Sequence, residues 1–207
     1  GKNVFEYPAQ SAQMAKNVEM LWWAFEEAAH DFQPANVAIW DALFPNWPSI
    51  PVHIDLIVGF PKPYDAVTMK DAAGHTHIVL DLIRWCDYGI PKDAEGVVHN
   101  LLAHEMTHAF IAARCPEADA AADGKDYRPK LDGLTFHEGF AHLIAYENRR
   151  IDQVNWDSDF WRQIEETSRS KMRVAVAETD PEKQKKHLRN GFCGRYEEKY
   201  ACMSGML

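Results

Sequence analysis

Two histidines and a glutamate occur at a spacing that suits a metal site, in the stretch His104-Glu105-Met106-Thr107-His108. If this stretch is helical, residues four apart share a face, so His104 and His108 point the same way and can hold one ion. Imidazole nitrogens suit Zn²⁺. Glu105 lies beside that ion, where its carboxylate can take a proton from water and return it to a leaving amine. This HExxH pattern therefore predicts metal-assisted hydrolysis of peptide bonds.

Apolar residues surround the motif on nearly all sides, which predicts a buried helix. Two histidines and a glutamate inside such a helix cost free energy unless they have partners. A metal ion is the simplest partner that satisfies all three, and the alternative is a core helix with hydrogen-bonded histidines. The apolar neighbours are Val97, Val98, Leu101, Leu102, Ala103, Met106, Ala109, Phe110 and Ile111.

The motif helix needs elements that hold it in place. It is predicted to run from Pro91 to about Arg114, with Asp93 as its N-cap and Cys115-Pro116 as its stop. An earlier amphipathic helix is predicted from Ser11 to Phe32, because apolar residues recur there at helical spacing. The segment from Ala35 to Ser49 contains two prolines and is predicted to be a loop or a short helix.

Strands are predicted between these two helices. Alternating apolar residues indicate a strand from Ile50 to Gly59. A hairpin is expected from Val67 to Lys70 and from His75 to Leu82, joined by a turn of the type Asp-Ala-Ala-Gly. The histidines on or beside these strands are predicted to be ordinary strand residues rather than ligands: His53, His75 and His77.

The part of the chain after the motif helix is predicted to be mostly helical. Residues from Glu117 to Asp132 are polar and contain breakers, which predicts an exposed connection. Helices are expected from Leu134 to Glu147, from Asp157 to Glu178 and from 182 to 201. We therefore predict one α+β domain, with a small mixed sheet packed on the motif helix in an N-terminal lobe (1–116) and a helical C-terminal lobe (117–207).

Composition excludes several classes of protein. The chain has 207 residues, 46% hydrophobic, which predicts a folded domain with a sizeable core. Its net charge of −9 argues against a nucleic-acid backbone as the main partner, and no apolar run is long enough for a transmembrane helix. The first residue, Gly1, suggests a processed terminus, and Cys193 and Cys202 can either pair or stay reduced. These features favour an extracytoplasmic or secreted location over a cytoplasmic one.

A catalytic zinc takes three protein ligands and leaves one position open, so a third ligand is needed. The segment His137-Glu138-Gly139-Phe140-Ala141-His142 resembles the second motif of the gluzincins, the NEGFA element of zinc aminopeptidases. The resemblance implies that Glu138 is the third ligand to Zn²⁺. From the residues alone, His137 and His142 are alternative third ligands. If Glu138 binds the metal, His142 is expected to orient a ligand or to contact substrate.

The departures from this family shape the expected activity. We find no GAMEN-like strand, by which the aminopeptidases read a free N-terminus, so endopeptidase action is favoured. Gluzincins take an oxyanion donor from a downstream Tyr or His, which implies Tyr196, Tyr200 or His187. The predicted strand from His75 to Leu82 is expected to be the edge that holds an extended peptide. The resemblance implies a zinc peptidase acting on peptides or proteins; the alternative is an inactive zinc-binding module with a peptide or protein partner.

Overall fold

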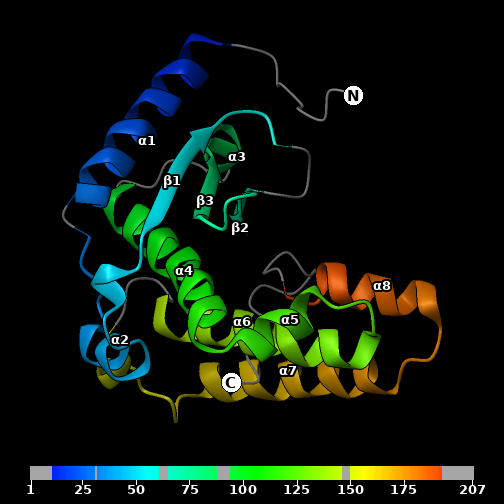
Figure 1. Cartoon of the computed structure of the whole chain (residues 1–207). Coiled ribbons are helices and arrows are strands. Elements are labelled where there is room, and N and C mark those ends of the chain that lie inside the picture. Colours follow the sequence, from blue (N-terminus) through cyan, green and yellow to red (C-terminus); the bar gives the residue numbers. More distant parts are fainter. Residues whose placement is uncertain (1–10, 31, 61–64, 88–93, 146–149, 193–207) are drawn as a thin grey trace.

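The computed structural model describes residues 11–30, 32–60, 65–87, 94–145 and 150–192 (Figure 1). This part of the chain is mostly helical and contains a small three-stranded sheet, which confirms the α+β prediction. The strands are β1 (Val52–Ile57), β2 (Ala66–Lys70) and β3 (Thr76–Asp81), and the helices are α1 (Ala12–His30), α2 (Val37–Leu43), α3 (Leu82–Asp87), α4 (Ala94–Arg114), α5 (Pro116–Asp123), α6 (Tyr127–Ala145), α7 (Asp159–Ala177) and α8 (Pro181–Asn190).

The sheet is mixed, with strand order β1-β3-β2. β1 runs parallel to β3, and β2 runs antiparallel to it, so the predicted hairpin is confirmed. The expectation that His75–Leu82 forms the edge of the sheet is wrong, because β3 pairs on both sides. The apolar residues of β3 suit this central position, because Ile78 and Leu80 are fully buried there. The edge next to the motif helix is β2.

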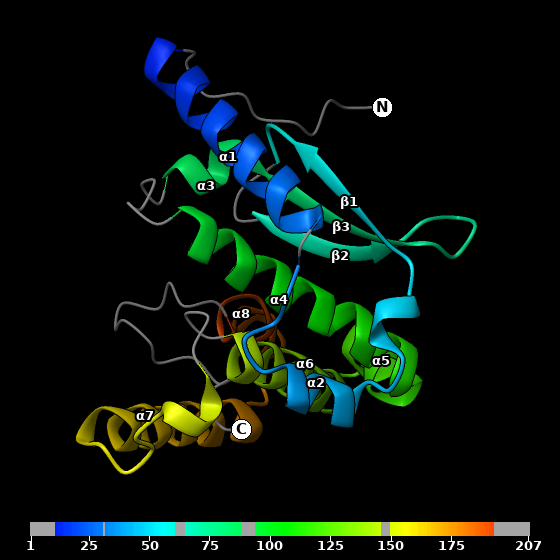
Figure 2. The ribbon, with the colours of Figure 1, turned by 90° about the vertical axis from the view of Figure 1, so that its left-hand side faces the viewer.

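The two faces of the sheet differ in chemistry. Side chains alternate along a strand, so the in-register pairs Ile54–Ile78 and Leu56–Leu80 lie on one face. This inner face packs with α1, α3 and the first half of α4 in one apolar cluster (Figure 2). The opposite, outer face carries the in-register pair His53–His77. One face of the sheet therefore builds the core, while the other presents polar groups.

Helix α4 runs through the middle of the molecule and takes part in two apolar clusters (Figure 1). Its first half contributes Val98 and Leu102 to the cluster under the sheet. Its second half contributes Phe110 to a cluster with Trp40 of α2 and with the end of α6. The predicted helix to Arg114 is confirmed, and its predicted N-cap, Asp93, lies outside the described residues. Because α4 is packed on both sides, its faces are fixed in direction.

The predicted exposed connection from Glu117 to Asp132 is wrong. Pro116 follows the end of α4 and is the first residue of a further helix, α5, since proline is tolerated at the first position of a helix. Helix α6 then begins at Tyr127, seven residues before the predicted start. Gly133 does not break it: a Cβ there would lie 2.5 Å from the backbone nitrogen of Ala122. The glycine lets α5 and α6 pack backbone against backbone.

The last two described helices complete the C-terminal part. Helix α7 matches the predicted range from Asp157 to Glu178 closely, and α8 covers the first half of the range predicted from 182 to 201. Residues 193–207 lie outside the described residues. Leu131 of α6 and Ala175 of α7 are fully buried in a third apolar cluster. Among the described helices, none is long and apolar enough to cross a membrane.

We expect Gly133→Ala to destabilise the protein. Although Ala is favoured over Gly in a helix by about 1 kcal/mol, its Cβ would meet backbone atoms of α5 that cannot move aside. Overpacking of this kind costs about 1–3 kcal/mol. Urea unfolding measures the loss, and Ser170→Ala, at an exposed position of α7, is the control. An unfolding free energy as high as that of the wild type would show that the α5–α6 contact is looser than described.

The turn between β2 and β3 should make stability depend on acid pH. Asp71 accepts hydrogen bonds from the backbone N–H groups of His75 and Ala73, each at 2.8 Å. These bonds, led by that of His75, lower the pKa of Asp71 from 3.8 to about 2. The folded pKa is below the unfolded one, so the contribution is full above about pH 4 and is lost as pH falls toward about 2. The stability difference between wild type and Asp71→Asn should shrink over this window in urea unfolding; an unchanged difference would contradict the assignment.

Candidate metal centre

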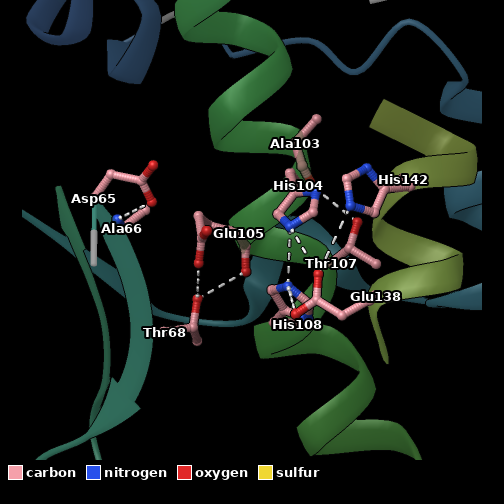
Figure 3. A network of polar contacts seen from close by, with 10 residues as sticks. All are labelled: Asp65, Ala66, Thr68, Ala103, His104, Glu105, Thr107, His108, Glu138 and His142. Atoms are coloured by element: carbon pink, nitrogen blue, oxygen red, sulfur yellow. Dashed lines mark hydrogen bonds and ion pairs between the residues drawn. The ribbon is translucent and has the colours of Figure 1, made fainter. Parts of the chain in front are cut away.

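His104 and His108 lie on the face of α4 that meets α6, and Glu138 of α6 faces them (Figure 3). The two Nε2 atoms are 3.2 Å apart. Glu138 brings Oε2 to 3.5 Å from His104 Nε2 and Oε1 to 3.8 Å from His108 Nε2. The structure thus brings together the three residues predicted as ligands, although they come from two helices.

The spacing and chemistry of this trio fit a metal ion. Two ligand atoms that each lie about 2.0–2.1 Å from a tetrahedral ion are roughly 3.4 Å apart, and the three separations above scatter around that value. All three side chains are at least three-quarters buried, with exposed fractions of 18%, 15% and 25%. Two imidazoles and a carboxylate suit zinc, and they also suit other transition metals. The trio can therefore hold a divalent cation.

Electrostatics keep two of the ligands in the protonation state that a metal requires. Burial opposes ionisation of Glu138, but His108 and His104 outweigh it and lower the pKa of that carboxyl to about 2. Burial lowers the pKa of His108 to about 3. For His104 the effect of burial is outweighed by Glu138, and its pKa is raised. Glu138 is therefore an anion and His108 a neutral imidazole at neutral pH, whereas the raised pKa of His104 favours its protonated form, which competes with metal binding.

Glu105 leaves α4 toward the sheet, while its neighbour His104 faces α6 (Figure 3). It is buried, and its Oε2 accepts a hydrogen bond of 2.9 Å from the hydroxyl of Thr68 on β2. Burial raises the pKa of Glu105, and the nearby His104 and the Thr68 bond oppose this only in part. A carboxylate in this position readily accepts a proton, which is the property required of a base.

His142 and His137 flank the trio on α6. His142 Nε2 is 3.9 Å from Glu138 Oε2, its ring lies 4.9 Å from that of His104, and its side chain is 38% exposed. His137 is buried and stacks on His108, with ring centroids 5.7 Å apart. Burial lowers the pKa of both imidazoles. Neither has its ring nitrogens grouped with the trio, so both stand beside the metal centre.

The other residues predicted from the sequence fall elsewhere. His187 of α8 lies 4.0 Å from Glu178 and is not among the groups that face the trio. Tyr196 and Tyr200 lie outside the described residues, as do Cys193 and Cys202. The two described cysteines, Cys86 and Cys115, are not in a disulfide. The oxyanion donor therefore stays a prediction.

Two polar residues near the site were missed by sequence reasoning. Thr68 holds Glu105, yet threonine is an ordinary strand residue and nothing in the motif points to it. Asp119 of α5 lies 4.0 Å from the buried Nε2 of His137 and 3.9 Å from Lys70 of β2. Asp119 was placed in a predicted loop, so its position between α6 and the sheet had no local signal.

We expect the trio to hold one tightly bound metal ion. His108→Ala and Glu138→Ala should each weaken metal affinity by more than the roughly 10–100-fold that outer hydrogen-bonding partners cost. Elemental mass spectrometry after purification without chelator, followed by competition with a chelator, measures this. Glu105→Gln should keep the metal, because the carboxylate lies beside the trio and not in it. If His142→Ala loses the ion and Glu138→Ala keeps it, the third ligand is His142.

Comparisons with known proteins add no relative to these observations. No protein-family model matches the chain, and neither a curated protein nor a solved structure matches it.

Proposed function

We propose that this protein is a zinc-dependent peptidase of the gluzincin type that cleaves within peptide chains. The observation that carries the proposal is the buried Glu105 beside a cluster of two histidines and one glutamate on facing helices. A site that only stored metal or held the fold together would need the ligands but not the base. The segment Glu138-Gly139-Phe140-Ala141, which matches the second gluzincin motif, supports the same assignment.

The residues divide the work as follows. His104, His108 and Glu138 would hold the zinc, which would supply Lewis-acid chemistry to water and to the carbonyl of the peptide bond. Glu105 accepts the proton that the attacking water loses and donates it to the departing nitrogen. Its elevated pKa before metal binding supports this role, since a base must also hold the proton it has taken.

The edge strand β2 supplies the place for substrate in this proposal. Thr68, in the middle of β2, donates its hydroxyl to Glu105, so the strand runs past the base. An extended peptide can add to a free sheet edge through backbone hydrogen bonds. A peptide on β2 would lie across α4 near both the base and the metal ligands. We therefore assign the binding of substrate to β2 and not to the predicted strand His75–Leu82, because β3 is central in the sheet.

Glu105→Gln tests the proposal. The variant should keep its metal and lose about 10²–10⁴-fold of peptide turnover, the usual contribution of a general acid–base group. Turnover is measured on an internally quenched peptide library with the zinc-loaded protein. Glu166→Gln, at an exposed position of α7, is the matched control and should keep full turnover.

Two outcomes would overturn the peptidase assignment. If the wild type holds zinc but cleaves no member of the library, the alternative of a zinc-binding module with a peptide partner is favoured. If Glu105→Gln cleaves as fast as the wild type, another base performs the reaction, and the role of Glu105 is structural.

A further inference from the structure

A cluster of imidazoles and carboxylates lies on the outer face of the sheet, which does not pack on α4. His53 of β1 and His77 of β3 are paired in register, and their rings stack with centroids 4.9 Å apart. The ring of His75, just before β3, lies 5.8 Å from that of His53. Asp55 and Asp71 complete the cluster. Three imidazoles and two carboxylates thus gather on one surface.

One carboxylate orients the central imidazole. Asp55 Oδ2 lies 2.6 Å from His77 Nδ1, which leaves His77 Nε2 for another partner. That nitrogen is buried and has no hydrogen-bond partner among the described residues. A histidine that binds metal commonly donates its other ring N–H to a carboxylate, which sets the direction of the ligating nitrogen. His77 has this arrangement, with Asp55 on its Nδ1.

The second carboxylate is held by the backbone. Asp71 Oδ1 accepts the turn hydrogen bonds from Ala73 and His75, so its position is fixed. Its other oxygen, Oδ2, then lies 3.5 Å from His77 Nε2 and 3.1 Å from His75 Nδ1. The separation of 3.5 Å is long for a hydrogen bond but suits two ligands of one ion. Asp71 and His77 are therefore held ready as a pair.

We propose that this outer face is a second binding site for a divalent transition metal, with His77, Asp71 and His75 as ligands and His53 beside them. Imidazole and carboxylate ligands favour Cu²⁺ or Zn²⁺ over hard cations such as Ca²⁺. The net charge of −9 further favours cations at the surface. Among the described residues, only the trio of the metal centre has all its ligand atoms within 4.8 Å of one another. The side chain of His75 is 59% accessible, and it completes the ligand set by turning toward His77 and Asp71.

The two sites are independent. Thr68 of β2 points to Glu105 and α4, whereas its neighbour Met69 pairs with His77 on the other face. The outer cluster therefore lies on the face of the sheet opposite to the one that meets Glu105 and α4. The second site does not rest on the proposed peptidase activity, and variants of one cluster leave the ligands of the other in place.

Equilibrium dialysis of metal-free protein against Zn²⁺, and separately against Cu²⁺, tests the second site. Wild type should bind two equivalents, Glu138→Ala and His77→Ala one each, and the double variant none. His75→Ala changes an exposed side chain and should weaken the second equivalent by about tenfold or more without affecting folding. His30→Ala, an exposed histidine at the end of α1, is the control.

The outcomes separate the two proposals. If wild type and His77→Ala bind equally many ions with equal affinity, the outer site is overturned, whatever Glu138→Ala does. If Glu138→Ala still binds two ions, the proposed role of Glu138 in the metal centre is overturned. The outer site is then decided by the His77→Ala and His75→Ala variants. In the His104→Ala/His108→Ala double variant, which removes both imidazoles of the metal centre, nitrogen hyperfine splitting in the Cu²⁺ electron paramagnetic resonance spectrum should report the imidazole ligands of the outer site. A spectrum without that splitting would also overturn the outer site.

Discussion

The approach of Glu138 to His104 and His108 is the contact on which the candidate metal centre depends. It places a carboxylate between two packed helices, where an uncompensated charge would cost several kcal/mol. The two imidazoles supply part of the compensation, and a divalent cation can supply the rest. Metal binding at this trio would be coupled to the packing of α6 on α4, because the three side chains come together only when the two helices are docked.

Helix α4 serves two neighbours at once. His104 and His108 face α6, whereas Glu105, which directly follows His104, faces the sheet. Adjacent positions on a helix differ by about 100° in direction, so one helix can direct imidazoles at one neighbour and a carboxylate at another. The apolar residues on either side of the motif hold this orientation, since they are buried in two different clusters.

The sheet is small, yet its inner face, its outer face and its edge strand β2 each make different contacts. Its inner face forms core with α1 and α4, and its edge strand β2 braces Glu105 through Thr68. Its outer face carries the second histidine cluster. Asp71 links the turn between β2 and β3 to the outer face, because one of its oxygens accepts the turn hydrogen bonds while the other faces the imidazoles.

The sequence by itself determined the features that depend on local spacing. The helical register puts His104 and His108 on one face, and apolar periodicity located α1, α4 and α7. The same reasoning found the β2–β3 hairpin through its turn residues. The EGFA segment, by its resemblance, pointed to Glu138. The predicted helices and the hairpin were confirmed because each needs only residues that are close along the chain, whereas the role of Glu138 as a third ligand stays a prediction.

Only the tertiary structure decided which segments meet. The strand order β1-β3-β2 places β3 in the centre of the sheet. The segment predicted to be a loop contains α5, which packs closely on α6 where Ala122 meets Gly133. Thr68 contacts Glu105 because β2 lies opposite that part of α4. The exposed histidines seemed ordinary in sequence because the pairing of β1 with β3 is what stacks His53 on His77. Such contacts join residues far apart along the chain, and their free energy comes from packing that no local pattern encodes.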